Sequence, residues 1–200
     1  MFIQVIQGHV TDPDATHEAL ERWHRELAPG SYGWLGTTAG VTDDGTLVAM
    51  ARFASREAAA HNSARPEQTR WWEETSRLFD GEVAFHDCSD VVLYRGGGAD
   101  SAGFVQIIEG RVADRDRMRT MLHDAEPVLT VHRPDLIGSE SAVDESGGYT
   151  EAAYFTSEEE AREAERREPP PELREMFEAY MGLFEGELAY FDLRRPWMYV

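Results

Sequence analysis

Hydrophobic and polar positions alternate in the same order in each half of the chain. In the first half, residues 2–10 are rich in β-branched and apolar side chains and predict a strand. Asp12-Pro13 starts a helix, with the aspartate as its cap, the proline at the first helical position and apolar residues along one stripe. Segments 34–41 and 47–53 predict two strands joined by a turn that contains Asp44-Gly45.

The remainder of the first half predicts a second helix and a last strand. The helix opens at Ser55, is broken or restarted at Pro66, and ends at Gly81. A last strand follows within 83–94. The order of elements is therefore β-α-β-β-α-β.

The second half repeats this pattern. Residues 2–10 match 104–112, an offset of 104 − 2 = 102 that persists as far as Phe53 and Phe155. From Pro66 onwards the offset is 171 − 66 = 105, so the second copy holds three extra residues around 166–170. We interpret the chain as a duplication: repeat 1 at 1–95, a glycine-rich linker at 96–103 and repeat 2 at 104–200.

The predicted fold class is α+β, with two tandem ferredoxin-like (βαββαβ) repeats. Each repeat would form a four-stranded antiparallel sheet with both helices on one face. The other face needs a cover, so we expect the repeats to pack sheet to sheet as a pseudo-dimeric α+β barrel. A single chain would then be sufficient as a monomer, while exposed outer strands leave room for a homodimer.

Four features carry a family resemblance: the strand Phe2–Val10, the segment Trp34-Leu35-Gly36, the step Phe53–Ala58 into the second helix, and the break at Pro66. On these the chain resembles the dimeric α+β-barrel superfamily, and within it the antibiotic-biosynthesis-monooxygenase-like (ABM) domains, in tandem duplication. The resemblance implies a pocket between each sheet and its helices. It implies less about activity, because this superfamily includes cofactor-free oxygenases, haem-degrading enzymes, isomerases and proteins without known activity.

Composition excludes several classes of function. Acidic residues number 38 and basic residues 19, giving a net charge of −19, and every basic residue is arginine. An acidic chain argues against nucleic acid as a partner, and the absence of lysine excludes Schiff-base chemistry and a P-loop. No apolar run is long enough to cross a membrane, and the first residues lack the basic segment of a secretory signal. We therefore expect a cytoplasmic protein without a membrane partner.

Repeat 1 contains the residue types that suit proton transfer. We expect His86, Asn62 and His61 to be catalytic, because an imidazole or amide can take a proton and stabilise a developing oxyanion. The expected substrate-binding residues are Trp71, Trp72, Trp23, Trp34 and Gln4. Repeat 2 has Glu163, Ala164, Met176, Phe177 and Phe191 at five of the matching positions, which favours repeat 2 as scaffold. Alternatively, Trp71 and Trp72 are core or rim aromatic residues, and His61 and Asn62 are solvated residues near the break before Pro66.

The function that the resemblance suggests is a cofactor-independent monooxygenase-like enzyme, or a related cyclase or isomerase, acting on an aromatic or polyketide-like small molecule. The alternative is a non-catalytic ligand-binding or structural protein. We expect no cofactor. The resemblance implies that the haem-degrading enzymes have an asparagine on the first strand and a tryptophan and an axial histidine on the second helix. This chain has Asn62 in place of that tryptophan, Trp71 in place of that histidine, and no asparagine near Ile6. We expect no metal either, since His17 and His24 are seven residues apart on a helix.

Gln4 and Gln106 recur at equivalent positions of half-buried strands and must be hydrogen-bonded. Either they pair with each other between the two sheets, which is the interpretation we favour, or Gln4 points into a pocket. The C-terminal segment 193–200 is apolar, so we expect it to pack onto the protein.

Overall fold

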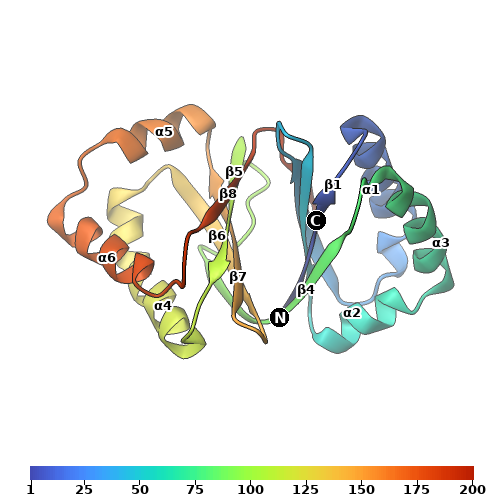
Figure 1. Cartoon of the computed structure of the whole chain (residues 1–200), viewed down its shortest axis with the longest axis horizontal. Coiled ribbons are helices and arrows are strands. Elements are labelled where there is room, and N and C mark those ends of the chain that lie inside the picture. The colour runs from blue at the N-terminus through green and yellow to red at the C-terminus, as the bar shows by residue number, and fades with distance from the viewer. The chain divides into compact units, whose positions relative to one another are not determined.

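A computed structural model describes residues 1–200, which divide into two compact units (Figure 1). The first unit comprises Met1–Ser89 and Arg195–Val200, and the second comprises Asp90–Arg194. The bounds of the units differ from those of the sequence repeats. Residues 90–95 of repeat 1 belong to the second unit, and residues 195–200 of repeat 2 belong to the first unit. The N- and C-terminal segments of the chain therefore belong to the same unit.

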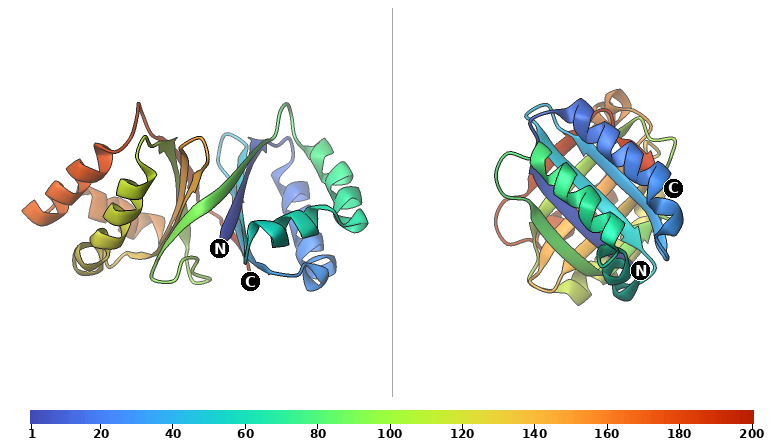
Figure 2. Two further views of the ribbon diagram at one scale, coloured as in Figure 1. Left: turned by 90° about the horizontal axis from the view of Figure 1, so that it is seen from below. Right: turned by 90° about the vertical axis from the view of Figure 1, so that its right-hand side faces the viewer.

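The first unit contains the predicted series of elements. These are β1 (Phe2–His9), α1 (Pro13–Glu26), β2 (Trp34–Val41), β3 (Thr46–Phe53), α2 (Arg56–Ser63), α3 (Pro66–Thr75), the first part of β4 (Ala84–Tyr94) and β9 (Trp197–Tyr199), with short 3₁₀ turns at Ala28–Gly30 and Ser76–Leu78. The antiparallel strands follow the order β4-β1-β3-β2-β9. All three helices cover one face of this sheet, as Figures 1 and 2 show.

Local sequence accounts for where these helices and turns begin. Asp12 Oδ1 accepts the Ala15 N–H at 3.0 Å at the start of α1, and Ser55 Oγ accepts the Ala58 N–H at 3.2 Å at the start of α2. Pro66 opens α3 and so separates it from α2, as predicted. Gly45 closes the hairpin between β2 and β3 with φ of 88°, a conformation that side chains disfavour.

The second unit repeats the same architecture. Its elements are β5 (Phe104–Arg111), α4 (Arg115–His132), β6 (Leu136–Asp144), β7 (Gly148–Phe155), α5 (Glu158–Arg166), α6 (Pro171–Met181) and β8 (Ala189–Leu193). Its strand order is β8-β5-β7-β6, with β4 as the neighbour of β6. Of the three extra residues, one lengthens α5 and two lengthen its connection to α6, which runs over 167–170 where the first unit has 64–65. The predicted α+β class and βαββαβ order of both repeats are confirmed.

Strand alternation decides which side chains face the helices. Phe2 packs with Phe53 of β3 and with Ala58 and Ala59 of α2. Phe104 occupies the same position in the second unit, where it packs with Phe155 and Ala161. Because strand residues alternate between faces, Gln4 and Gln106 also point to the helix side of their sheets.

The C-terminal segment packs down as predicted, in the form of a strand. β9 pairs with β2, and Tyr199 lies opposite Thr37. The Trp197 ring stacks on His17 of α1, with centroids 4.4 Å apart and planes 9° apart. No helix has both the length and the apolar composition needed to cross a membrane.

Candidate functional site

Three of the predicted substrate-binding tryptophans form a packed cluster in the first unit. The Trp23 ring lies edge-on to Trp34 and Trp71, with centroids 5.3 and 6.4 Å away. Each indole N–H is satisfied inside the protein: Trp23 donates to Gln68 Oε1, Trp34 to Thr37 Oγ1 and Trp71 to the Ala19 carbonyl. Together with Leu27 and Ala28, these rings form a hydrophobic core under the helices.

Asn62 and His61 lie at the end of α2 in different surroundings. Asn62 is only 5% exposed, and its Oδ1 accepts a hydrogen bond from Arg65 at 3.0 Å. The same guanidinium donates to the Leu27 carbonyl at 3.1 Å and to Glu67 at 2.9 Å. Asn62 therefore helps to hold α2 against the end of α1, whereas His61 is exposed.

His86 lies on the sheet face that the helices do not cover. It is opposite Val5 in the pairing of β4 with β1. Its neighbour Phe85 faces Trp72 of α3, with ring centroids 5.3 Å apart, so alternation points His86 the other way. The structure therefore does not bring His86 together with Asn62 and the tryptophans, and the catalytic roles assigned to His86, Asn62 and His61 stay sequence-based predictions.

The repeated glutamines each bond to an aspartate of their own repeat. Gln4 Nε2 donates to Asp87 Oδ1 at 3.0 Å, and Gln106 Nε2 donates to Asp192 Oδ1 at 2.9 Å. In both repeats the glutamine lies directly opposite its aspartate in the strand register. These two pairs replace the expected pairing of Gln4 with Gln106. They also give the recurrent aspartates a structural partner.

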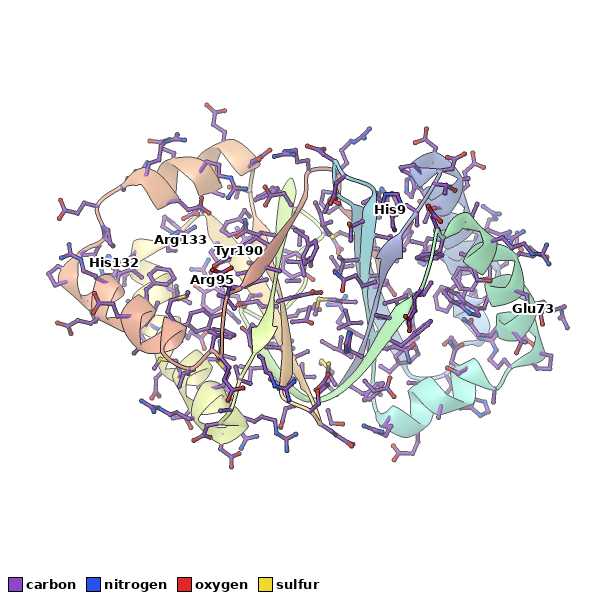
Figure 3. The ribbon with its side chains drawn as sticks, viewed as in Figure 1. His9, Glu73, Arg95, His132, Arg133 and Tyr190 are labelled. Carbon is purple, nitrogen blue, oxygen red and sulfur yellow. The ribbon has the colours of Figure 1, made fainter.

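The second unit carries a pocket on the helix side of its sheet, which we call the helix-side pocket. Its volume is about 250 Å³. Its apolar lining includes Ile108, Ala125, Leu129, Ala153, Met176 and Phe177, and its polar lining consists of Gln106, Arg133, Glu151, Glu165, Tyr180 and Tyr190. Figure 3 shows Arg133 and Tyr190 on the helix side of the second unit's sheet.

Comparison of the repeats explains why this pocket exists. With the offsets of 102 and 105, the positions of Trp23, Trp34 and Trp71 correspond to Ala125, Leu136 and Met176. All three of these smaller residues line the helix-side pocket. The indoles that fill the first unit are thus replaced by side chains that leave the second unit open.

A hydrogen-bonded network of hydroxyls surrounds Glu151 beside this pocket. Glu151 Oε2 accepts the Tyr149 hydroxyl at 2.8 Å and the Tyr180 hydroxyl at 3.0 Å. The two phenol oxygens are 3.1 Å apart, and Ser141 Oγ lies 3.1 Å from that of Tyr149. The rings of Tyr149 and Tyr180 pack edge-on against each other and against Phe184, which holds the hydroxyls in place.

The network keeps both tyrosines protonated. Burial raises the pKa of the Tyr149 and Tyr180 hydroxyls well above the ordinary value of 10.0. The neighbouring Glu151 carboxylate raises both pKa values further, because a phenolate would place a second negative charge beside it. Both hydroxyls therefore act as hydrogen-bond donors at neutral pH.

Charged groups near the edge of the pocket are paired with one another. Arg133 makes a two-pronged contact with Asp135, at 2.8 and 3.1 Å. Arg162 bonds to Glu165 and Asp192. A shallower hollow that includes Arg162 and Asp192 shares Gln106, Glu165 and Tyr190 with the helix-side pocket. The apolar pocket thus leads into a polar, charge-paired region.

Solved structures resemble this chain over almost its whole length. One, from Lactobacillus acidophilus NCFM, is described as a "putative monooxygenase"; it is 14% identical, the match covers 96% of this chain and 92% of that one, and the TM-score is 0.72. A second is an anthrone oxidase-like protein, with 11% identity, coverage of 98% and 92%, and a TM-score of 0.67. The chain has the tandem fold of these monooxygenase-like proteins.

A third solved structure links this fold to the ABM domains. It is an uncharacterized ferredoxin-fold protein from Listeria monocytogenes 4b F2365, related to antibiotic biosynthesis monooxygenases, with 11% identity, coverage of 96% and 92%, and a TM-score of 0.50. The resemblance noted from the sequence is therefore confirmed at the level of the fold. No model of a protein family matches the sequence, and no curated protein matches it.

The polar network was not predicted from the sequence. A comparison of the repeats does carry a sign of it, because repeat 1 has Leu47, Ala49 and Thr75 at the positions of Tyr149, Glu151 and Tyr180. That signal was present in the sequence, although only the fold shows that the three positions meet.

Proposed function

We propose that the helix-side pocket binds a small aromatic or polyketide-like molecule and that the protein acts on it as a cofactor-independent monooxygenase-like enzyme. The observation that carries this proposal is the contrast between the units. The same place under the helices is filled by indoles in the first unit and is open, apolar and bordered by a few polar groups in the second. Such a lining is typical of small-molecule sites.

The size of the pocket favours a small ligand. About 250 Å³ is slightly below the ~300 Å³ at which pockets for drug-sized ligands begin. One or two fused rings would fit under the helices, and a further ring would extend toward the polar hollow near Tyr190 and Asp192. The methionines among the lining residues adapt readily to flat aromatic ligands.

The proposed reaction converts a methylene group beside a carbonyl or aromatic ring into a carbonyl, with dioxygen as oxidant. A base removes one C–H proton, and the electron pair left on carbon reduces O₂ and forms the C–O bond of a peroxide. The peroxide takes up a proton and loses water as the second C–H bond breaks, which leaves the C=O group. One oxygen atom stays in the product and the other leaves as water. Glu151 and Glu165 are the pocket carboxylates that supply a proton acceptor.

Oxygen uptake with anthrone tests this proposal. We expect one O₂ to be consumed per anthrone oxidised, at a rate above that without protein. We expect this activity to be lost in Ala125→Trp, which places an indole at the position equivalent to Trp23 of the first unit. Val131→Trp, at an exposed position of the same helix, is the control and retains activity. Ligand binding without oxygen uptake would instead support the non-catalytic alternative, and equal activity in both variants would place the reaction elsewhere.

A further inference from the structure

Around Glu151 the helix-side pocket offers hydrogen-bond acceptors, because the hydroxyl hydrogens of the two neighbouring tyrosines are already engaged. Tyr149 and Tyr180 each have one hydroxyl hydrogen, and Glu151 Oε2 lies within 3.0 Å of both oxygens. The Ser141 hydroxyl is engaged with Tyr149 in the same network. A carboxylate has about four acceptor positions, so Glu151 retains acceptor capacity after both tyrosines have bonded to it.

From this arrangement we infer that Glu151 selects the ligand of the helix-side pocket, and that the ligand is a neutral aromatic molecule with a hydroxyl group near that carboxylate. The inference rests on the proposed function, because it concerns the same pocket. A hydroxyl would donate its hydrogen to the carboxylate. A carboxylate or phenolate ligand would find acceptors opposite its own negative charge.

The cations near the pocket do not reverse this preference. Arg133, at the end of α4, is held by Asp135, and Arg162 of α5 is held by Glu165 and Asp192. Tyr190 of β8 is the remaining ionisable group of the lining, and partial burial raises its pKa above the ordinary value. No lining arginine is therefore left without an anionic partner inside the protein.

The network is confined to the repeat with the open pocket. The first repeat has Ala39, Leu47, Ala49 and Thr75 at the positions of Ser141, Tyr149, Glu151 and Tyr180. Glu151 is half-buried, so its carboxylate has exchanged part of its hydration for the two tyrosine hydroxyls. Because the cavity and the network occur in the same repeat, we relate the network to ligand selection.

Binding of three probes of equal ring size tests the inference: naphthalene, 2-naphthol and 2-naphthoate, with the full-length protein at neutral pH. We expect 2-naphthol to bind at least roughly ten-fold more tightly than 2-naphthoate, the effect of one hydrogen bond to a charged group. In Glu151→Gln, whose amide offers both a donor and an acceptor, we expect the ratio of the two affinities to fall about ten-fold. Glu187→Gln, at an exposed position before β8, is the matched control and keeps the ratio.

A measurement on the unmodified protein covers the case in which Glu151→Gln does not fold. The absorption of bound 2-naphthol, followed as pH rises, should show the hydroxyl ionising at higher pH than in water, because the carboxylate opposes a second negative charge. Ionisation at the same or lower pH would overturn the inference. If all three probes bind equally, the pocket binds aromatic ligands but Glu151 is not the selecting group. If none binds, the proposed function itself is wrong.

Discussion

The Tyr180 hydroxyl of α6 lies 3.0 Å from Glu151 Oε2 of β7, so a helix and a central strand are joined by a hydrogen bond at the wall of a pocket. The equivalent positions in the first unit are Thr75 and Ala49, which cannot form such a contact. The two repeats therefore share a backbone plan and differ in what lies between helices and sheet.

The first prediction concerns stability at high pH. The folded-state pKa values of Tyr149 and Tyr180 lie above the unfolded value near 10, so above pH ~10 the unfolded chain loses these protons first. The contribution of these two tyrosines to the free energy of unfolding should be fully present below pH ~10. It should fall as pH rises toward their folded-state pKa values, by up to about 1.4 kcal/mol per pH unit for each tyrosine. Urea titrations across this range measure the slope. Tyr149→Phe and Tyr180→Phe should each reduce it, and an unchanged slope in both would contradict the assignment.

The second prediction concerns the volume of the helix-side pocket. Ala125→Trp should abolish binding of 2-naphthol while the far-ultraviolet circular dichroism is retained, because the indole occupies the space that Trp23 fills in the first unit. Overpacking would lower the free energy of unfolding by about 1–3 kcal/mol. Fluorescence titration measures the binding. Val131→Trp serves as the control, and normal binding by Ala125→Trp would mean that the ligand lies elsewhere.

The third prediction concerns the tryptophan cluster. Trp23→Ala should lower the free energy of unfolding by about 3–5 kcal/mol, because it removes the ring between Trp34 and Trp71 and leaves Gln68 without its donor. Chemical denaturation measures this change. Trp72→Ala should cost less, since that ring packs against the exposed Phe85. A smaller loss for Trp23 than for Trp72 would be inconsistent with a core role for Trp23.

The fourth prediction uses the two Gln–Asp pairs as an internal comparison. Asp192 accepts from Gln106, which is 8% exposed, and is also paired with Arg162 and Arg194. Asp87 is exposed and accepts from Gln4. Asp192→Asn should therefore lower the free energy of unfolding by about 1–3 kcal/mol, and Asp87→Asn by less than about 1 kcal/mol. Equal effects, measured by thermal unfolding, would show that the added arginine contacts contribute nothing.

The fifth prediction is that Asn62 contributes to stability and that His86 does not contribute to ligand binding in the helix-side pocket. Asn62→Ala should lower the free energy of unfolding by about 1–3 kcal/mol, because it takes away the Oδ1 acceptor of the largely buried Arg65 guanidinium. His86→Ala should leave ligand binding in the helix-side pocket unchanged, since His86 belongs to the other unit. Denaturation and probe titration on both variants measure these effects. Loss of oxygen uptake in a stably folded His86→Ala would instead favour the catalytic role predicted from the sequence.

Much of the fold could be predicted because its signals are local or repeated. Asp12-Pro13, Ser55, Pro66 and Asp44-Gly45 mark element boundaries through capping and turn chemistry that needs no distant partner. The matching blocks at offsets of 102 and 105 then transfer each boundary to the second repeat. This consistency is why the βαββαβ order was correct in both halves.

The candidate site was harder to predict because its signals are not local. Trp71 and Trp72 attract attention as aromatic residues, yet periodicity alone does not say whether a ring fills a core or lines a cavity. Glu151 and Tyr180 are 29 residues apart and lie on different elements. Neither stands out in a chain with 38 acidic residues and seven tyrosines.

The sequence by itself determined that this protein is a duplicated α+β chain, because strand alternation, helix caps and internal repetition are written in neighbouring residues. Only the tertiary structure decided which repeat is open and which is filled. Whether a cavity exists depends on the summed volumes of side chains from several elements, such as Ala125, Ala153 and Met176. Those volumes meet only when the helices lie on the sheet.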